Sequence, residues 1–485
     1  MRAEATFLAD WVVIAPVLLC LAGAALLLML RGMLRIQAWV AAAIVLAVLA
    51  CDAVLFLRVL GDAPLSMTMG NWLPPFGISF TADVMGAGFA LAAAFAALCV
   101  LLYMQGDTPE SAVRDGAYPL LLLLLAGVTG AFLTGDLFNL YVWFEVMLIA
   151  SFGLIVLAGN PLQLDGAVKY GVLNFLATTL FLAALGLLYG LLGTLNMADI
   201  IGKAATADAA PLTAVAALFA LAFGMKAAVF PVNAWLPASY HTPPPAISAL
   251  MGGLLTKVGI YALIRTLVML LPEARGHLSV TILVVAVATA ILGPLSAIAE
   301  TNLRRAIGFL LIGGVGIILT AVSDGTSFAL SGGIAYAAHA IVTITALYLM
   351  AGLIERATGY FDTRQMRGLY AANSLVSILF LVLILAISGV PPFLGFWPKL
   401  LLLQGYIGER SWVPVLAVLF NALLTLIAGT RLWSHIFWRG EAERASLPFA
   451  QMSAAFLLTA VIFIIGLWPD LLVRAASIAA VGLSP

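Results

Sequence analysis

Residues 223–237 read FGMKAAVFPVNAWLP, and they place Lys226 inside an apolar run just ahead of Pro231. Proline removes a backbone donor, so a helix that carries this stretch breaks soon after its lysine. At membrane depth, a charge beside a broken helix is tolerated only where neighbouring helices hold the segment or where it lines a hydrated cavity. The stretch therefore indicates a membrane helix that contains residues with a functional role.

The composition of the whole chain supports a membrane location. Of the 485 residues, 64% are hydrophobic and 9% are charged, and the formal net charge is zero. About 20 apolar residues span the hydrocarbon core of a bilayer. The apolar runs here are continuous rather than alternating, which indicates helices rather than strands. We expect an all-α integral membrane protein that contacts the lipid bilayer and has no nucleic-acid partner.

Fourteen apolar segments are candidate transmembrane helices, and no soluble domain separates them. The first is expected to be a retained helix rather than a signal peptide, because its flanks lack a cleavage site. The chain is thus predicted to form a single membrane domain, residues 1–485. The candidate spans are 8–30, 36–58, 80–104, 117–133, 138–158, 168–193, 211–230, 246–271, 279–299, 304–322, 329–354, 373–388, 412–436 and 452–474.

The basic residues predict an orientation, because connections rich in arginine and lysine face the cytoplasm. On this rule both termini face outward and the odd-numbered connections face inward. The odd connections hold Arg31, Arg35, Arg114, Arg304, Arg305, Arg356, Arg364, Arg367, Arg439 and Arg444; the even connections and termini hold Arg2, Arg58, Lys203, Arg275, Arg410 and Arg474.

The lysines are distributed differently from the arginines. The chain has five lysines; Lys169, Lys226 and Lys257 lie within or at the ends of apolar helices, and Lys399 follows a second broken segment. Arginine keeps its charge under nearly any burial, whereas a desolvated ammonium can release its proton. This placement indicates proton handling. The alternative, which stays open for Lys169 above all, is that a lysine near a helix end only reaches the lipid headgroups.

Other titratable residues lie at membrane depth. Glu145 is the expected partner of Lys226, since a lone charge there is costly; the alternative is a static salt bridge that only orders two helices. His241 and His339 are candidates to bridge lysines through water, or else to hydrogen-bond within the core. The three cysteines, Cys20, Cys51 and Cys99, have no ligand-like spacing and are expected to be packing residues, and the sequence predicts neither a metal site nor a cofactor.

The helix break after Lys226 recurs late in the chain. Residues 388–399 read SGVPPFLGFWPK, with Pro391 and Pro392 ahead of Lys399. Each break follows the fourth helix of a five-helix unit, and two tandem units with an odd number of helices run in opposite directions through the membrane. The expected parts are N-terminal helices in 1–110, a first repeat in 117–271, an inverted second repeat in 279–436 and a C-terminal helix in 452–485.

Four stretches carry a family resemblance: GNWLPPFGISFTADVM (70–85), TGDLFNLYVWFEVML (134–148), residues 223–265 and residues 388–399. Together they resemble the D-type subunit of the Mrp multisubunit cation/proton antiporters and, more distantly, the antiporter-like subunits of respiratory complex I. The resemblance covers nearly the whole chain. It implies a subunit of a monovalent cation (Na+)/proton antiporter in a bacterial plasma (inner) membrane. Such a subunit would not be an enzyme, and its partners would be the other subunits of the complex.

The resemblance also assigns roles to residues. The family's membrane glutamate falls on Glu145, its partner lysine on Lys226, its central lysine on Lys257 and its terminal lysine on Lys399. The second unit departs from the pattern: Thr343 and Ile344 stand where relatives commonly carry a lysine, and residues 308–317 (GFLLIGGVGI) are glycine-rich and apolar.

These departures lead to a specific expectation for the second half of the path. Protons are expected to cross between His339 and Lys399 on ordered water, helped by the hydroxyls of Thr343 and Thr345 and by the break at Pro391 and Pro392. Gly313, Gly314 and Gly316 either leave room for that water or serve tight helix packing. Two alternative functions stay open: a proton-pumping subunit of a complex I or membrane-bound hydrogenase relative, and a structural subunit that has lost conduction.

Overall fold

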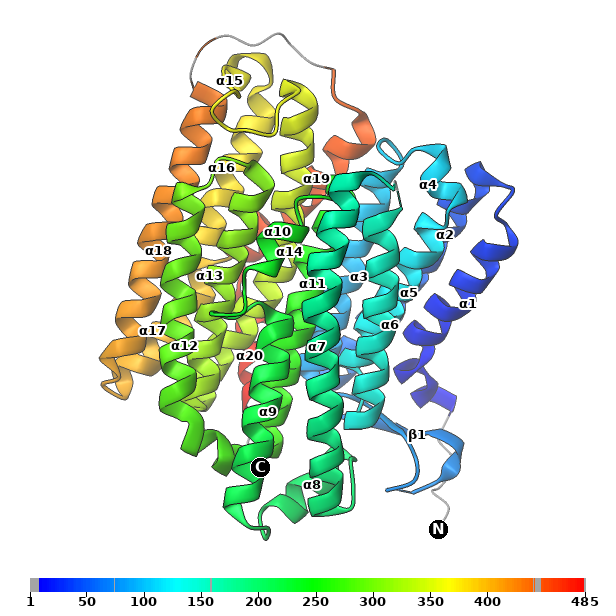
Figure 1. Cartoon of the computed structure of the whole chain (residues 1–485), viewed down its shortest axis with the longest axis vertical. Coiled ribbons are helices and arrows are strands. Elements are labelled where there is room, and N and C mark those ends of the chain that lie inside the picture. Colours follow the sequence, from blue (N-terminus) through cyan, green and yellow to red (C-terminus); the bar gives the residue numbers. More distant parts are fainter. Residues whose placement is uncertain (1–7, 74, 158, 439, 441–445, 484–485) are drawn as a thin grey trace.

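The computed structural model describes residues 8–73, 75–157, 159–438, 440 and 446–483. Arg2, Arg439 and Arg444, which entered the orientation argument, lie outside them. The chain forms a bundle of long helices with one two-stranded hairpin (Figure 1). In chain order the elements before the first break are a 3-10 turn Leu8–Val13, α1 Ala15–Met29, α2 Leu34–Gly61, β1 Leu65–Thr68, a 3-10 turn Met69–Asn71, β2 Ser79–Ala82, α3 Val84–Met104, α4 Glu110–Arg114, α5 Ala117–Phe132, α6 Leu137–Val156, α7 Pro161–Leu192, α8 Met197–Ala204 and α9 Ala209–Ala227.

The remaining elements begin with the short helix in the first break. They are α10 Trp235–Ser239, α11 Pro245–Leu263 with a π-helical end Ile264–Leu270, α12 Pro272–Ala299, α13 Leu303–Asp324, α14 Ser327–Thr358, α15 Leu369–Ala372, α16 Ser374–Ser388, α17 Phe396–Gly408, α18 Trp412–Trp433 with a π-helical end Ser434–Trp438, α19 Phe449–Leu467 and α20 Asp470–Val481.

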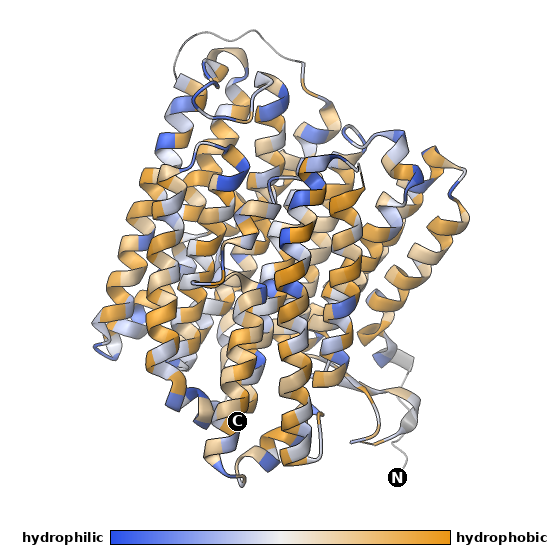
Figure 2. Ribbon diagram, in the orientation of Figure 1, coloured by the Kyte–Doolittle hydropathy of each residue, from blue (hydrophilic) through white to orange (hydrophobic). Residues whose placement is uncertain are grey.

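The predicted all-α membrane fold is confirmed. Within the described residues, 11 helices are long and apolar enough to cross a membrane, and three shorter apolar helices, α1, α5 and α16, coincide with further predicted spans. The count of fourteen crossings stays a prediction. Apolar residues dominate the helices along their length, and hydrophilic ones gather toward the two ends of the bundle (Figure 2).

Several predicted helix limits differ from the structure: α1 begins at Ala15, α7 at Pro161 and α12 at Pro272, each seven residues from the expected start. Two further differences have a clear local cause. The span expected from residue 80 starts at Val84, because residues 79–82 pair with β1 and Asp83 caps the helix by accepting from the backbone N–H of Gly86. The span expected at 452–474 is two helices, since α19 ends at Leu467 and α20 begins after Pro469, which has no N–H to continue the helix.

The first and last described elements, the turn Leu8–Val13 and the end of α20, lie at one end of the bundle, and α4 and α15 lie at the other (Figure 1). This agrees with an even number of crossings and with termini on the same side of the membrane. Which side faces the cytoplasm stays a prediction.

The centre of the bundle is formed by α11, α13 and α14. The most apolar 18-residue stretches of these helices are 94–100% buried, whereas those of α7, α12 and α18 are 39–44% buried. Glycines let the central helices approach closely: a methyl group on Gly253 of α11 would lie 2.0 Å from the Thr345 hydroxyl of α14. The central helices are therefore almost wholly covered by other helices.

Packing of the same kind joins α13 to α12. A methyl group on Gly316 would lie 2.3 Å from the backbone nitrogen of Ala290, so neither a rotamer change nor a side-chain shift relieves the contact. We expect Gly316→Ala to destabilise the protein by roughly 1–3 kcal/mol, the usual cost of overpacking. The test is the melting temperature of the detergent-solubilised protein. Gly186→Ala is the matched control, because nothing lies within 4 Å of a methyl group there; equal melting temperatures for the two variants would contradict the expectation.

The two helix breaks have the same local geometry. The chain leaves α9 at Ala228 and α16 at Gly389, both in the left-handed region with φ of 59° and 84°. A cis proline bond follows each, at Phe230–Pro231 and at Pro391–Pro392. Short helices, α10 and α17, follow the breaks.

The starts of α6 and α13 are a second pair of features that have the same local geometry. An isolated antiparallel bridge joins Asp136 to Asn196 before α6, and another joins Asn302 to Asp362 before α13. In each, the first residue of the helix donates its N–H across the bridge, from Leu137 to Leu195 O and from Leu303 to Phe361 O. On the strength of the matched bridges and the left-handed helix ends, we propose that residues 117–271 and 279–436 are inverted repeats.

Candidate functional site

Four titratable cationic or imidazole side chains lie buried on helices that pack side by side. Lys226 on α9, Lys257 on α11 and His339 on α14 are each 1% exposed, and Lys399 on α17 is 4% exposed. In this order each helix contacts the next. The side chains therefore follow one another across the interior of the bundle, which we call the buried row.

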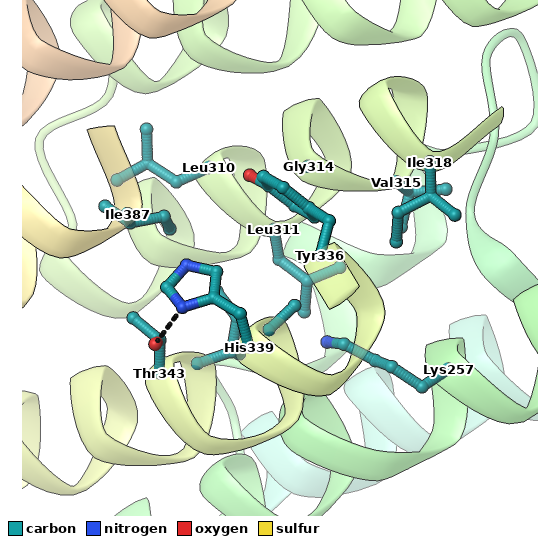
Figure 3. A pocket seen from close by; sticks show the side chains of 12 residues that line it. Lys257, Leu310, Leu311, Gly314, Val315, Ile318, Tyr336, His339, Thr343 and Ile387 are labelled. Atoms are coloured by element: carbon teal, nitrogen blue, oxygen red, sulfur yellow. Dashed lines mark hydrogen bonds between the residues drawn. The ribbon is translucent and has the colours of Figure 1, made fainter. Parts of the chain in front are cut away.

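A small cavity joins the middle two members of the row (Figure 3). It is lined by Lys257, Tyr336, His339 and Thr343 among apolar residues, and about 10 Å³ is open to the centre of a water molecule. That is roughly the least space that holds one water. Lys257 donates to the backbone oxygen of Gly252 at 2.8 Å, and its ammonium points toward the cavity (Figure 3). The cavity therefore has room for about one water among Lys257 and the polar side chains of α14.

One ring nitrogen of His339 has a hydrogen-bond partner, and the other has none. Nδ1 lies 3.0 Å from the hydroxyl of Thr343, one turn further along α14. Nε2 has no hydrogen-bond partner and lies against Gly395, in the segment that follows the second break. The imidazole therefore has its first nitrogen fixed and its second directed to the broken helix.

Lys399 occupies that break. Its Nζ donates to the backbone oxygens of Ser388 at 2.8 Å and of Ile387 at 3.3 Å, which are carbonyls at the end of α16. The same ammonium lies 6.0 Å from the ring centroid of Tyr336, and that ring lies 5.6 Å from the ring of His339. Tyr336 thus stands between the last two members of the row. The sequence interpretation missed it, although its place one turn before His339 was a usable signal.

Lys226 at the other end has no hydrogen-bond partner for its Nζ, which lies 5.6 Å from the centroid of the Phe144 ring. No ion pair within 4 Å joins it to Glu145, although both residues are among those described. Glu145 is half-buried on α6, next in sequence to Phe144, the ring that Lys226 approaches. Direct contact of the predicted pair is therefore absent from this structure, and any coupling acts over a longer distance or through water.

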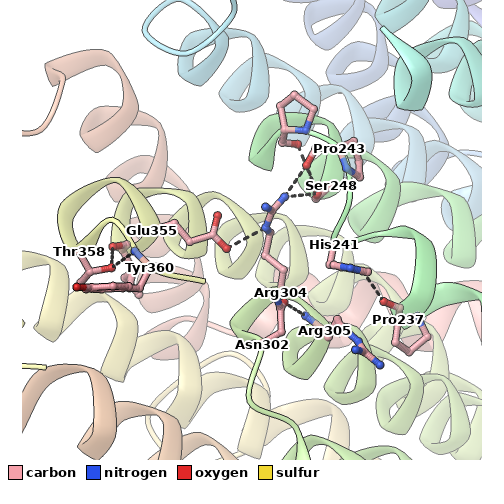
Figure 4. A network of polar contacts seen from close by, with 12 residues as sticks. Pro237, His241, Pro243, Ser248, Asn302, Arg304, Arg305, Glu355, Thr358 and Tyr360 are labelled. Atoms are coloured by element: carbon pink, nitrogen blue, oxygen red, sulfur yellow. Dashed lines mark hydrogen bonds and ion pairs between the residues drawn. The ribbon is translucent and has the colours of Figure 1, made fainter. Parts of the chain in front are cut away.

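The structure does not place His241 between lysines. Its Nδ1 lies 2.9 Å from the backbone oxygen of Pro237. Figure 4 shows it beside the network in which Arg304 pairs with Glu355 at 2.9 Å and also binds the backbone oxygen of Pro243. This network ties the start of α11 to the end of α14.

Of the other residues named from the sequence, some lie at the buried row and others do not. Thr343 contacts His339, but Thr345 donates to Ile341 O and faces α11. Gly314 lines the cavity, whereas Gly313 and Gly316 pack against α12. Lys169 pairs with Asp165 at 2.5 Å, and both side chains are about half exposed (49% and 54%), which favours the surface alternative. The described residues contain no group of three or more potential metal ligands.

The sequence interpretation also passed over Asp52 in the second predicted span. This carboxyl group is fully buried on α2 and neither oxygen has a hydrogen-bond partner. Its acidic type inside an apolar helix was the available signal. It lies on a different helix from the buried row.

The fold and the buried row define an integral membrane protein with titratable side chains in its interior. Residues 134–425 match the family model described as NADH:quinone oxidoreductase/Mrp antiporter, TM. The chain is 35% identical over 457 residues to the D-type subunit of a Na(+)/H(+) antiporter from Bacillus subtilis, covering 93% of this chain and 92% of that protein.

The D-type subunit of a Na(+)/H(+) antiporter from Alkalihalophilus pseudofirmus is 38% identical over 378 residues, 78% of this chain and 76% of that protein. A chain in the structure of the Mrp complex from Dietzia sp. superposes with a TM-score of 0.92 at 26% identity, over 99% of this chain and 98% of that one. The chain belongs to the NADH:quinone oxidoreductase/Mrp antiporter membrane family.

Proposed function

We propose that this chain is a D-type subunit of an Mrp multisubunit antiporter and carries protons along the buried row in exchange for a monovalent cation, Na+ being the first candidate. Its partners are the other subunits of that complex, and its place is the bacterial plasma (inner) membrane. The antiporter subunits found as relatives support the assignment, and they favour a transporter over an enzyme.

The observation that carries the proton path is the cavity between Lys257 and His339. Two titratable groups from different helices line one space that has room for a water, on helices whose most apolar stretches are almost wholly buried. Proton transfer needs groups within hydrogen-bond reach or joined by one water. The proposed order is Glu145, Lys226, Lys257, His339 and Lys399, with His241 removed from the sequence-based set because its surroundings lie elsewhere.

The function is tested by purifying the complex from its native membrane and reconstituting it in liposomes. We expect Mrp-type subunits to co-purify, and addition of Na+ to dissipate an imposed pH gradient. Co-purification with hydrogenase or quinone-reducing subunits would instead support the proton-pumping alternative, which the family description itself includes. A correctly assembled Mrp-type complex in which no buried-row substitution affects transport would support a structural role.

Coupling between Glu145 and Lys226 gives a separate prediction. Because the two groups do not touch, we expect Glu145→Gln to slow cation-dependent proton movement and Lys226→Met to slow it more. We expect the double variant to resemble Lys226→Met alone, since coupled residues are not additive. The measurement is the initial rate in liposomes for all four proteins. Strictly multiplicative losses would show that the two residues act independently.

A further inference from the structure

His339 borders a second cavity besides the small one that it shares with Lys257. This second cavity, which we call the large cavity, has a volume of about 380 Å³, within the usual range for a small-molecule site. It is lined by residues within 49–56 of α2, 84–95 of α3, 334–342 of α14 and 461–479 of α19 and α20, together with Leu394. The His339 side chain therefore lines both the small cavity and the large cavity.

The lining of the large cavity is almost wholly hydrocarbon. Among the described residues that form it, none is an aspartate, glutamate, lysine or arginine, and only His339 and Trp468 have a nitrogen or oxygen in the side chain. A buried water needs two to four polar partners, so this lining does not hold a cluster of waters. If the space is empty, its lining loses dispersion contacts. The large cavity therefore suits an apolar occupant.

The large cavity opens to the surface of the bundle at the junction of α19 and α20. Ile464, Trp468 and Leu471 line it and are themselves exposed, at 55%, 70% and 55%. Because α19 is one of the helices long and apolar enough to cross a membrane, hydrocarbon tails of the bilayer surround its exposed side. A lipid acyl chain thus reaches the large cavity without crossing water.

The wall formed by α19 is fixed to the second helix break. Nε1 of Trp397 on α17 donates to the backbone oxygen of Gly466, near the end of α19, at 2.8 Å. A methyl group on Gly466 would lie 2.5 Å from the backbone oxygen of Pro392, and Leu394 from the same segment lines the large cavity. Since α19 already touches the break there, it cannot move inward to close the large cavity.

The size of the large cavity favours an acyl chain over a helix of a partner subunit. One turn of α-helix with its side chains is about 10–12 Å across and 5.4 Å long, and it occupies roughly 400–600 Å³. That is more than the whole volume of the large cavity, whereas an acyl chain is thin and unbranched. Lipid tails are as apolar as leucine, so the chain gains no hydrophobic free energy on leaving the bilayer. What stabilises it is the set of dispersion contacts made in filling the space.

We propose that the large cavity binds one acyl chain of a membrane phospholipid, which enters at the junction of α19 and α20 and lies against His339. The hydrocarbon of the chain keeps water away from this side of the imidazole. Water then reaches His339 from the small cavity, and a proton held there passes along the buried row. This consequence for protons rests on the proposed function, whereas binding of the chain does not.

The test is photolabelling of the intact complex in liposomes that contain a phospholipid with a diazirine in one acyl chain. Labelled peptides are then identified by mass spectrometry. We expect label on residues 334–342, because the most apolar stretch of α14 is 94% buried and the large cavity gives the chain access to it. A phospholipid with the diazirine in its headgroup should leave these residues unlabelled. Absence of acyl-chain label there, or equal label from both lipids, would overturn the proposal.

A substitution that fills the large cavity gives a second check. Ala92 on α3 lines it, so the ring introduced by Ala92→Phe takes up part of the space, and we expect the label on 334–342 to be lost. Ala183→Phe is the matched control, because Ala183 is exposed on α7 and the label should remain. A label that Ala92→Phe leaves unchanged would put the chain elsewhere and count against the site. Should that variant not assemble, Ala475→Phe fills the large cavity from α20.

The acyl-chain site and the proposed function fail in different ways, since photolabelling needs no ion transport. Coupled transport that depends on Lys257, together with no label on 334–342, would overturn the acyl-chain site and leave the function standing. Label on 334–342 in a complex that moves no protons would support the site and overturn the proton path.

Discussion

Lys257→Arg should reduce cation-dependent proton movement to background while leaving the complex assembled. The substitution keeps a positive charge at the centre of the bundle, where the lysine is 1% exposed. What it removes is the ability to release a proton, because a guanidinium stays charged under nearly any burial. If Lys257 alternates between its charged and neutral forms, a permanent charge stops the cycle at that step.

The measurement is Na+-induced dissipation of a pH gradient in liposomes, with assembly checked by co-purification of the other subunits. Lys203→Arg is the matched control: Lys203 donates to the backbone oxygen of Leu192 in a connection outside the buried row. Normal transport by Lys257→Arg would show that proton release from this residue is not part of the mechanism. Loss of assembly in both variants would point to a defect in folding.

His339→Ala should slow the same reaction by roughly two orders of magnitude or more, the usual loss when a positioned proton-transfer group is removed. The imidazole is the only titratable side chain lining the cavity besides Lys257 and Tyr336 among the described residues, and its free nitrogen faces the second break. Thr343→Val is the control for the environment, because it removes the hydroxyl beside Nδ1 and keeps the imidazole. We expect a smaller loss from it.

The outcome is interpreted together with Lys399→Ala. If His339→Ala transports normally and Lys399→Ala does not, then protons bypass the imidazole, and Tyr336 with ordered water is the remaining route. If neither substitution matters, the second half of the chain has a structural role. The measured quantity in each case is the initial rate of cation-dependent proton movement, normalised to the amount of assembled complex.

The sequence indicated which residues lie at membrane depth. It gave less information about which helices face one another. A charged residue within an apolar run is at membrane depth, so Lys226, Lys257 and Lys399 could be selected without a structure, and prolines marked both breaks. Whether two residues at equal depth face one another depends on how helices pack. This is why His241, near the lysines in sequence, lies instead beside the network of Arg304 and Arg305 (Figure 4), and why Tyr336 was not recognised.

The end of α16 has a consequence for how exchange is enforced. Its last carbonyl groups carry the partial negative charge of a helix C-terminus, and the ammonium of Lys399 already sits on them. Unwound carbonyls at such helix ends are also what coordinates Na+ in other transporters. A metal cation arriving there would compete with the protein's own ammonium for the same oxygens. The Lys399 ammonium and the metal cation could then not occupy the helix end together. Competition of that kind favours exchange of the proton and the metal cation over their joint passage.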